Sequence, residues 1–404
     1  MKLGIVYHMP CWRASDGSLR EVEGSFARYV DSLAPYFDEI SLCVPVPREA
    51  RGEGTPIRSA NVTLAALPCF DGPAQFYPSL PMALPRLVRW VRAIDLLHCR
   101  VPSPAAIFAF TLARAAHRPA FLLVVGDLRA LLPTMPYRGA KRLLWRSYTE
   151  LEEWAVQRMA DRSLTFANGA ALAAKHGRPA RPVFETTTTT IGVGDMADRG
   201  DTCHARPVRI LTVSRIEPRK GLRILPEVVR LLVASGIDAT LDIVGPTVGR
   251  PGEDERNAIL EAAARLAVDD RVSVLGPVPL ERLLPMYRRY DAFVLPTLPG
   301  EGIPRVLLEA MTSGLPVVTT RVAGIPGLVT HEANGLLVDE PTARGVADAL
   351  GRIVTDAPLR SRLIARGYET ARGLTLEAQA ARMMDTVSRQ LHVTLRQPAA
   401  VPAA

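Results

Sequence analysis

Several features that would place this chain outside the ordinary globular proteins are missing from its sequence. The five cysteines are odd in number and form no CxxC pair, so we expect neither a zinc site nor a disulfide framework. No apolar run reaches the ~18–20 residues of a membrane-spanning helix. Residues 1–7 lack the apolar core and cleavage site of a signal peptide. Aromatic residues make up 6%, and no RNA-binding signature is present. These absences favour a cytoplasmic protein that does not bind nucleic acid.

The composition is otherwise that of a folded protein with a positive surface. The chain has 404 residues, of which 48% are hydrophobic and 22% charged, and its net charge is +8. At ~150 residues per domain this length predicts two or three domains. The positive charge leaves a field that attracts phosphate groups or anionic lipid.

Short apolar runs alternate with longer segments of helical periodicity in both halves of the chain. Strands are expected at Leu3–Tyr7, Glu39–Val46, Val62–Leu67, Ile94–Cys99, Phe121–Val125, Leu164–Ala167, Val208–Val213, Thr240–Val244, Arg271–Leu275, Ala292–Leu295 and Leu315–Thr319. Helices are expected at Gly24–Tyr36, Gly221–Leu232, Glu253–Ala267, Pro279–Tyr290, Pro304–Thr312 and Leu376–Leu391. Strands that alternate with crossover helices form parallel sheets covered on both faces. We therefore expect an α/β protein of two Rossmann-like, doubly wound domains that face each other across a cleft.

The domain limits follow from changes in this pattern. The first domain is expected at 1–194, a polar linker without periodicity at 195–206, and the second domain at 207–372. Residues 373–396 are expected to form a helix that packs back toward the first domain, and residues 397–404 a disordered tail. The run Thr186–Thr190 is predicted to be a strand, because β-branched residues favour extended backbone.

A basic pair, Arg215 and Lys220, follows the apolar strand Val208–Val213. A loop between a strand and a helix lies at the carboxyl edge of the sheet and at a helix N-terminus, where an anion is favoured. The pair is therefore a candidate clamp for a diphosphate. The alternative is a solvated turn that carries two basic residues, and this loop alone does not separate the two.

Two carboxylates, Glu301 and Glu309, stand at the start of the expected helix Pro304–Thr312 and two turns further on. Gly302 would let backbone amides approach a ligand closely. Glu301 would accept hydroxyl hydrogen bonds, and Glu309 would bind a vicinal diol. Otherwise Glu301 only complements the helix dipole and Glu309 is a solvated helix residue. The apolar neighbours of Glu309 argue against a solvated role, since an unpaired carboxylate among them would be costly.

Two glycine-containing turns end neighbouring strands. Gly245 follows Thr240–Val244, and Gly276 with Val278 follows Arg271–Leu275. Each turn is a candidate backbone contact for a nucleotide base, and each is equally compatible with an ordinary turn.

Taken in order, these motifs resemble the donor domain of retaining family 4 glycosyltransferases (glycosyltransferase group 1), which have the GT-B architecture. The matching stretches are LTVSRIEPRKG (211–221), DIVG (242–245), VSVLGP (272–277), MYRRYDAFVLP (286–296), EGIPRVLLEAMTSGLPVVT (301–319) and NGLLV (334–338). The first half resembles the acceptor domain of the family more weakly, through residues 1–7, 24–30 and 152–172.

The resemblance implies roles for the singled-out residues. Arg215 and Lys220 would neutralise the diphosphate of a sugar nucleotide (UDP-, GDP- or ADP-linked), Glu309 would bind the ribose, and Glu301 would hold the donor sugar. Further contacts would come from Gly245, Gly276, Val278, Gly302, Ile303, Pro304 and Arg305. The reaction would retain anomeric configuration by front-face attack, with the leaving phosphate as the base. No metal or other cofactor is expected.

The chain also departs from the family pattern. Many relatives carry a His after the strand equivalent to Phe121–Val125, where this chain has Gly126 and Asp127. Asp127 is carried over as a catalytic-site candidate, with a helix N-cap as its alternative. A Gly-Gly pair is replaced by Gly24 and Ser25, which leaves Gly24 as the candidate ligand contact. Gly327 stands where relatives often have a Glu.

The acceptor would be a glycan, a lipid-linked molecule or a small molecule, and the protein a monomer or homodimer. Basic and aromatic residues are interleaved in residues 137–146 (YRGAKRLLWR) and in Pro85–Leu97. This pattern favours weak contact with an anionic membrane at its inner face, with a solvated helix face as the alternative. A GT-B epimerase or phosphorylase, or a non-catalytic binder of sugar nucleotides or anions, remains an alternative function.

Overall fold

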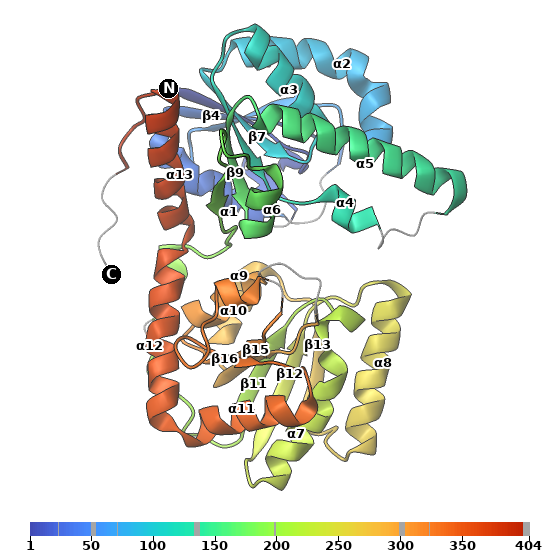
Figure 1. The fold of residues 1–404 in the computed structure, drawn as a ribbon, viewed down its shortest axis with the longest axis vertical. Coiled ribbons are helices and arrows are strands. Elements are labelled where there is room, and N and C mark those ends of the chain that lie inside the picture. Colours follow the sequence, from blue (N-terminus) through green and yellow to red (C-terminus); the bar gives the residue numbers. More distant parts are fainter. Residues whose placement is uncertain are drawn as a thin grey trace. The chain divides into compact units, whose positions relative to one another are not determined.

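A computed structural model describes residues 1–22, 24–49, 54–70, 72–132, 138–197, 199–298, 304–322 and 324–398 of the chain. The chain forms two compact units. Unit 1 comprises Met1–Thr188 and Leu376–Ala404, and unit 2 comprises Thr189–Thr375. Each unit contains a parallel sheet with helices on both faces (Figure 1). This is the two-domain α/β class that the sequence predicts.

Unit 1 is built on a seven-stranded parallel sheet in the order β10-β9-β8-β7-β1-β4-β6. The strands are β1 (Lys2–Val6), β4 (Glu39–Pro45), β6 (Val62–Leu67), β7 (Leu96–Val101), β8 (Ala120–Val124), β9 (Leu164–Asn168) and β10 (Phe184–Thr186). The central strands are buried on both faces, which explains their continuous apolar sequences. The order reverses between β1 and β7, and the carboxyl ends of such strands form the usual ligand crevice.

Two groups of helices cover this sheet. On one face α1 (Ser25–Leu33) packs against α13 (Leu376–Leu391), so the final helix belongs to unit 1. On the other face lie α2 (Pro73–Arg92), α3 (Pro104–Ala115) and the long α5 (Gly139–Ala160). The short helices α4 (Leu128–Leu131) and α6 (Ala170–His176) follow β8 and β9.

Unit 2 contains a six-stranded parallel sheet in the order β13-β12-β11-β14-β15-β16. The strands are β11 (Val208–Val213), β12 (Ala239–Val244), β13 (Val272–Gly276), β14 (Ala292–Leu295), β15 (Val317–Thr320) and β16 (Leu336–Val338). The helices are α7 (Leu225–Ala234), α8 (Gly249–Arg265), α9 (Leu280–Tyr287), α10 (Arg305–Thr312), α11 (Ala343–Thr355) and α12 (Ala357–Gly373). This is the strand order of the Rossmann fold, with its reversal between β11 and β14.

A small antiparallel sheet in unit 1 is absent from the sequence-based expectation. It pairs β2 (Cys11–Arg13), β3 (Leu19–Glu21) and β5 (Thr55–Ile57). Strands of three residues are too short to show a period of two, so the pattern carries no signal for them. The sheet places Glu21 beside the start of α1, where its carboxylate accepts hydrogen bonds from the backbone.

The expected strand at Thr186–Thr190 is wrong beyond Thr186, where β10 ends. Side-chain hydrogen bonds replace the ladder in this segment. The Thr188 amide donates to Asn168 Oδ1 over 2.8 Å, and the Thr190 hydroxyl donates to Glu309 Oε1 over 2.8 Å. The chain passes from unit 1 to unit 2 within this run, after Thr188.

The segment expected as a linker at 195–206 lies inside unit 2, where residues 199–206 are anchored by buried groups. Cys203 is buried in the core of the unit. The Arg360 guanidinium, also buried, donates to both carboxylate oxygens of Asp201 over 2.8 Å. The unit therefore begins earlier than the expected boundary at 194, because contacts from distant residues hold this polar segment.

Among the helices of the described residues, none combines the length and apolar character needed to span a bilayer.

Replacement of Asp201 by Ala should destabilise unit 2 by about 3 kcal/mol, because it leaves the Arg360 charge buried without its counter-ion. Urea unfolding followed by circular dichroism measures the change. The matched control is Glu369→Ala, which breaks the exposed pair of Glu369 with Arg366 and should cost less than about 1 kcal/mol. Equal effects of the two substitutions would contradict the anchoring role of Asp201.

Candidate functional site

Four loops of unit 2 meet at the carboxyl edge of its sheet. Backbone hydrogen bonds join three of them in series, from Ser214 to the Val244 carbonyl over 2.9 Å and from Gly245 to the Gly276 carbonyl over 2.8 Å. The loop after β14 joins them where the Leu298 amide donates to the Arg219 carbonyl over 2.8 Å. The loops after β11 and β14 flank the point where strand order reverses, which is where open α/β sheets bind ligands.

Two glycines make this close packing of loops feasible. Gly245 has a φ of 149°, and a Cβ there would lie 1.8 Å from the Ser214 carbonyl oxygen. Gly221 has a φ of 67°, and a Cβ there would lie 2.2 Å from the Pro296 carbonyl oxygen. Any side chain at either position would push two loops apart. Gly245, expected from the sequence as a base contact or a turn, is thus required by loop packing itself.

The loop after β11 concentrates positive charge at this edge. Lys220 ends a 3-10 turn (Pro218–Lys220) and is buried, whereas Arg215 is exposed. One carboxylate, Glu217, lies 3.4 Å from Arg215 Nη2 and 3.0 Å from Arg219 Nη2. Residues 214–221 therefore carry three cations for one anion. The structure brings Arg215 and Lys220 into one loop whose charge favours a bound anion.

Glu309 lies within α10 and is only 5% exposed, so its interpretation as a solvated helix residue is wrong. Its two carboxylate oxygens accept hydrogen bonds from the Thr190 hydroxyl over 2.8 Å and from the Tyr287 hydroxyl over 2.9 Å. Burial and the adjacent carboxylate raise the pKa of Tyr287 well above its ordinary value, so this hydroxyl stays protonated and donates. Each carboxylate oxygen keeps a second lone pair for a ligand hydroxyl.

Thr190 and Tyr287 are partners of Glu309 that the sequence did not predict. Thr190 lies in the segment that follows β10, and Tyr287 is the last residue of α9. No spacing in the sequence connects either residue with α10. The family-matching stretches contain Tyr287 and Glu309 but not Thr190, and they do not show which of their residues contact each other. A buried carboxylate in an apolar helix does predict that donors exist, but not where they come from.

The remaining donor-site candidates divide into two sets. Glu301, Gly302 and Ile303 lie outside the described residues. Pro304 caps the N-terminus of α10, and Arg305 is its exposed first residue. Gly276 ends β13 with a φ of 71°, and Val278 is partly buried against the core beside α9 and α10.

Asp127 in unit 1 caps a helix, which is the alternative that the sequence left open. Its Oδ1 accepts hydrogen bonds from the amides of Arg129 and Ala130 at the start of α4. Its Oδ2 lies 2.8 Å from Lys175 Nζ. Partial burial acts to raise the pKa of the Asp127 carboxyl, but the hydrogen bonds from Lys175 and the two amides outweigh it and hold the pKa below its usual range.

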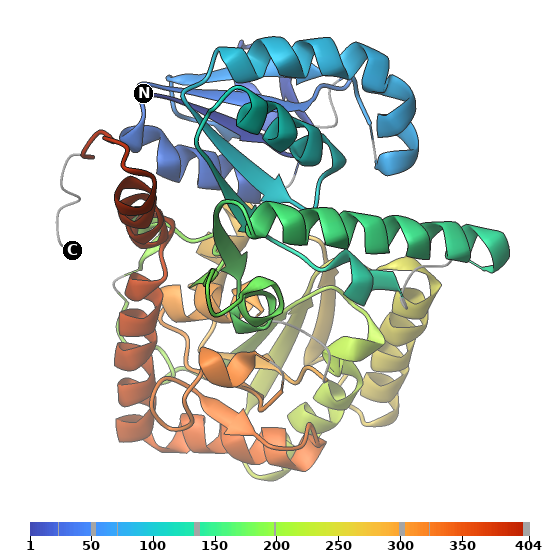
Figure 2. The ribbon, with the colours of Figure 1, turned by 45° about the horizontal axis from the view of Figure 1, so that its top comes forward.

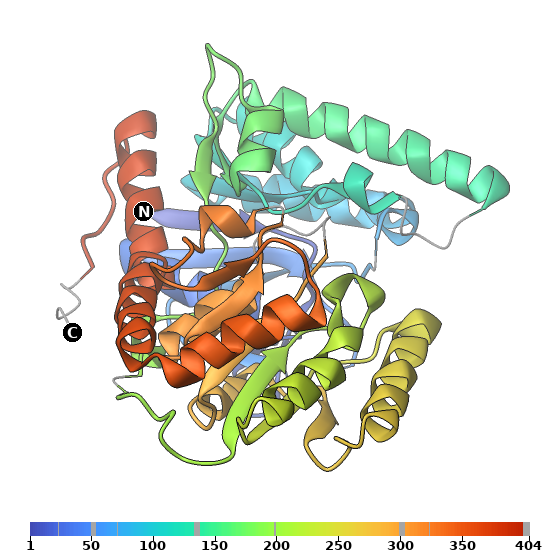
Figure 3. The same ribbon diagram turned by 60° about the horizontal axis from the view of Figure 1, so that its bottom comes forward.

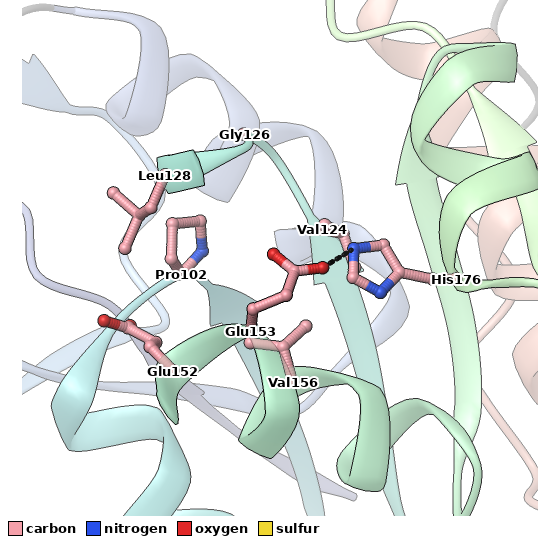
Figure 4. A pocket seen from close by; sticks show the side chains of 8 residues that line it. All are labelled: Pro102, Val124, Gly126, Leu128, Glu152, Glu153, Val156 and His176. Carbon is pink, nitrogen blue, oxygen red and sulfur yellow. Dashed lines mark ion pairs between the residues drawn. The ribbon is translucent and has the colours of Figure 1, made fainter. Parts of the chain in front are cut away.

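Lys175 also pairs with Glu153 over 2.9 Å, and Glu153 faces His176 across a small pocket (Figure 4). The pocket is lined by Pro102, Val124, Gly126, Leu128, Glu152, Glu153, Val156 and His176. Burial lowers the pKa of His176 despite the neighbouring Glu153. An internal ion-pair chain therefore occupies the position after β8, where relatives were expected to carry a His.

Gly24 adopts a left-handed conformation with a φ of 79°, and a Cβ there would lie 2.9 Å from Thr55 Oγ1. It precedes α1, whose first amides at Phe26 and Ala27 donate to Glu21 Oε1 over 3.0 and 3.1 Å. A carboxylate of the chain itself thus complements this helix end. The backbone conformation accounts for Gly24 without a ligand.

No group of three or more His, Cys, Asp or Glu side chains among the described residues is arranged to hold a metal ion.

Comparison with known proteins identifies the second half of the chain. Residues 207–356 match the family described as Glycosyl transferases group 1, which confirms the resemblance to group 1 glycosyltransferases over this region. Amylovoran biosynthesis glycosyltransferase AmsK of Erwinia amylovora is 35% identical over 153 residues, 37% of this chain and 36% of that protein. D-inositol 3-phosphate glycosyltransferase of Corynebacterium glutamicum (strain R) is 32% identical over 174 residues, 42% and 41% of the two chains. The matched part spans about two fifths of the length of these relatives.

Solved structures extend the likeness to the whole fold. The crystal structure of Anabaena Alr3699/HepE in complex with UDP has a TM-score of 0.68 at 18% identity, covering 96% of this chain and 100% of that one. The crystal structure of WaaG, a glycosyltransferase involved in lipopolysaccharide biosynthesis, has a TM-score of 0.63 at 15% identity, covering 96% and 99%. The expected GT-B architecture is confirmed at the level of the fold.

Replacement of Glu309 by Ala should destabilise unit 2 by about 2 kcal/mol, because two buried hydroxyls lose their acceptor. Glu309→Gln should cost roughly half as much, since its amide oxygen still accepts one hydrogen bond. Urea unfolding without any nucleotide measures both changes. Glu261→Ala, on the exposed face of α8, is the control and should change stability by less than about 0.5 kcal/mol. A Glu309→Ala protein as stable as this control would show that the hydrogen bonds contribute nothing.

Proposed function

We propose, from the group 1 glycosyl transferase region at residues 207–356, that the chain is a retaining glycosyltransferase. It would move a sugar from a nucleotide diphosphate to a hydroxyl of a glycan, a lipid-linked molecule or a small molecule. The observation that carries this proposal is the cationic loop of Arg215 and Lys220 at the strand-order reversal of unit 2.

The reaction develops negative charge on the departing diphosphate. Fixed cations beside that charge stabilise the transition state more than the bound substrate, which accelerates the chemical step. Lys220 is buried, so its charge acts where water screens it little. Arg215 is more exposed and would neutralise the outer phosphate oxygens.

Transfer with retention balances without an added base. The acceptor hydroxyl forms the new glycosidic bond from the face on which the phosphate leaves, and its proton passes to the leaving phosphate oxygen. Glu309 would hold the ribose through the lone pairs that Thr190 and Tyr287 leave unused. Glu301 would hold the donor sugar, and the backbone of 302–305, Gly245, Gly276 and Val278 would contribute further donor contacts.

UDP is the first nucleotide to test as the donor's carrier, because structures of Anabaena Alr3699/HepE contain UDP and UDP-glucose. Thermal unfolding of the full chain with UDP, GDP and ADP ranks the bases, and hydrolysis of matching sugar nucleotides then ranks the sugars. Stabilisation by none of the three nucleotides would contradict the proposed donor site. A phosphorylase would instead release a sugar 1-phosphate from a glycan when inorganic phosphate is added, and an epimerase would convert the sugar while it stays attached to the nucleotide.

Lys220→Ala should lower turnover on the order of 10²-fold, which corresponds to a few kcal/mol of lost transition-state stabilisation. The measurement is release of the nucleotide diphosphate at saturating sugar nucleotide. Arg219→Ala is the matched control, because Arg219 is an exposed cation of the same loop, and it should change turnover less than threefold. Unchanged turnover in Lys220→Ala would remove the role assigned to this residue.

We also propose a weak contact with anionic membrane, made by the first turns of α5. Leu143 and Leu144 are 66% and 70% exposed, and the exposed basic residues Lys141, Arg142 and Arg146 flank them. These turns extend past the other helices of unit 1 (Figures 2 and 3). Exposed leucines beside basic residues suit the interface of an anionic bilayer. In the second expected cluster, Trp90 is buried and donates to Ser41 Oγ, so that cluster offers no aromatic side chain to a membrane.

The double variant Leu143→Glu/Leu144→Glu should reduce co-sedimentation with phosphatidylglycerol vesicles by about tenfold or more, since two apolar contacts are lost and two negative charges are added. Binding of the unaltered chain should rise with anionic lipid content and fall with salt. Leu260→Glu on α8 is the control and should bind as the unaltered chain does. Co-sedimentation that depends on neither lipid charge nor salt would contradict the contact.

A further inference from the structure

An arginine lies buried at the carboxyl end of β7 in unit 1. Arg100 is 6% exposed and stands one residue before the end of this strand. β7 neighbours β1 in the sheet, and the strand order reverses between them. This is the place in unit 1 that corresponds to the cationic edge of unit 2, and it is where such sheets bind ligands.

Three aromatic rings surround the Arg100 guanidinium. Its Cζ lies 4.3 Å from the centre of the Tyr29 ring, 4.8 Å from that of Tyr7 and 5.4 Å from that of Phe26. Rings at these distances attract the cation through its electrostatic interaction with their faces. The Tyr29 hydroxyl also lies within hydrogen-bonding reach of the guanidinium, but Nε and Nη1 remain to be satisfied.

Two of the three guanidinium nitrogens have no acceptor in the part of the chain that the structure describes. Nε and Nη1 of Arg100 are buried and make no hydrogen bond to any described residue. Two described carboxylates lie close in sequence to these rings. Glu21 accepts hydrogen bonds from the amides of Phe26 and Ala27, and Asp31 accepts them from the amides of Arg58 and Ser59. Arginine stays charged at all accessible pH values, and a buried charge without a partner is costly.

The histidines beside Arg100 do not offset its charge. The Tyr29 hydroxyl lies 2.9 Å from His98 Nε2, which occupies that ring nitrogen. Burial lowers the pKa of His98 well below its ordinary value, and the positive charge of Arg100 acts in the same direction. Burial likewise lowers the pKa of His8, which lies two residues after β1. Both rings are neutral at physiological pH. The charge of Arg100 therefore remains available to attract an anion at this edge of the sheet.

We propose that Arg100 binds an oxyanion, a phosphate or a carboxylate, carried by the acceptor. The planar fork of a guanidinium matches the paired oxygens of either group. The aromatic cage fixes the fork before the ligand arrives, so little side-chain entropy is lost on binding. The acceptor class is then an anionic glycan, lipid or small molecule. The identification with the acceptor rests on the proposed function, whereas the oxyanion site itself does not.

The test titrates inorganic phosphate into the full chain at constant ionic strength, with line broadening of the ³¹P signal as the readout. Four variants are compared with the unaltered chain: Arg100→Met, Arg100→Lys, Lys220→Ala and the exposed-residue control Arg114→Met. Arg100→Met should weaken phosphate binding at least tenfold, Arg100→Lys by a smaller factor, and Arg114→Met not at all. Circular dichroism confirms that each variant is folded, and Arg100→Lys keeps the test valid if Arg100→Met is not.

Addition of excess UDP separates the two sites. Phosphate bound at the donor site is displaced by UDP and weakened in Lys220→Ala, whereas phosphate bound at Arg100 is unaffected by either. If the proposed donor site is wrong, phosphate binding at Arg100 can still be measured. If the proposal for Arg100 is wrong, phosphate binding at the donor site can still be measured. Competition by acetate at equal concentration identifies a carboxylate site, and its absence identifies a phosphate site.

A structural role for Arg100 gives a different result. If phosphate binding in the presence of UDP is the same in Arg100→Met, Arg100→Lys and the unaltered chain, the guanidinium only packs against its three rings and the proposal is overturned. The same conclusion follows if the unaltered chain binds no phosphate once UDP is present.

Discussion

The close approach of the strand-end loops in unit 2 is the constraint on which the donor site depends. Gly221 and Gly245 let three loops share backbone hydrogen bonds at distances that no side chain would permit. That packing holds the turn that ends at Lys220, and thereby fixes a cation at the edge of the sheet. A flexible loop of the same composition would carry the same charge but would lose entropy on ordering it around a diphosphate.

The buried charged residues Arg360, Glu309 and Arg100 differ in the partners that they have within the chain. Arg360 is paired with Asp201 and anchors a polar segment, which is a structural use of a charge. Glu309 is satisfied by two neutral hydroxyls, so it stays hydrogen-bonded while it keeps lone pairs for a ligand. Arg100 is enclosed by rings that attract its charge but leave its Nε and Nη1 donors unused by the described residues. Arg360 has its counter-ion within the chain, Glu309 has hydrogen bonds and spare lone pairs, and Arg100 has donors without an acceptor among the described residues. The need for a partner from outside the chain increases in that order.

Most strands of the two main sheets, but not β10 and β16, were predictable to within a residue or two, because parallel strands buried on both faces are continuous apolar runs. Val208–Val213 and Ala292–Leu295 coincide with β11 and β14, and Leu376–Leu391 with α13. The small sheet of β2, β3 and β5 was not predictable, since three residues show no period. The strand predicted at Thr186–Thr190 was wrong for another reason. β-branched residues favour extended backbone, but this segment makes hydrogen bonds with the side chains of Asn168 and Glu309 in place of a strand ladder.

The sequence by itself determined the two α/β units, the cationic loop after β11 and the family of residues 207–356, because each is written in consecutive residues. Only the tertiary structure decided what the isolated polar residues do. Asp127 caps a helix and pairs with Lys175, Glu309 receives the hydroxyls of Thr190 and Tyr287, and Arg100 sits within three rings. The partners in each case come from distant elements, and the packing of those elements depends on contacts that no local pattern encodes.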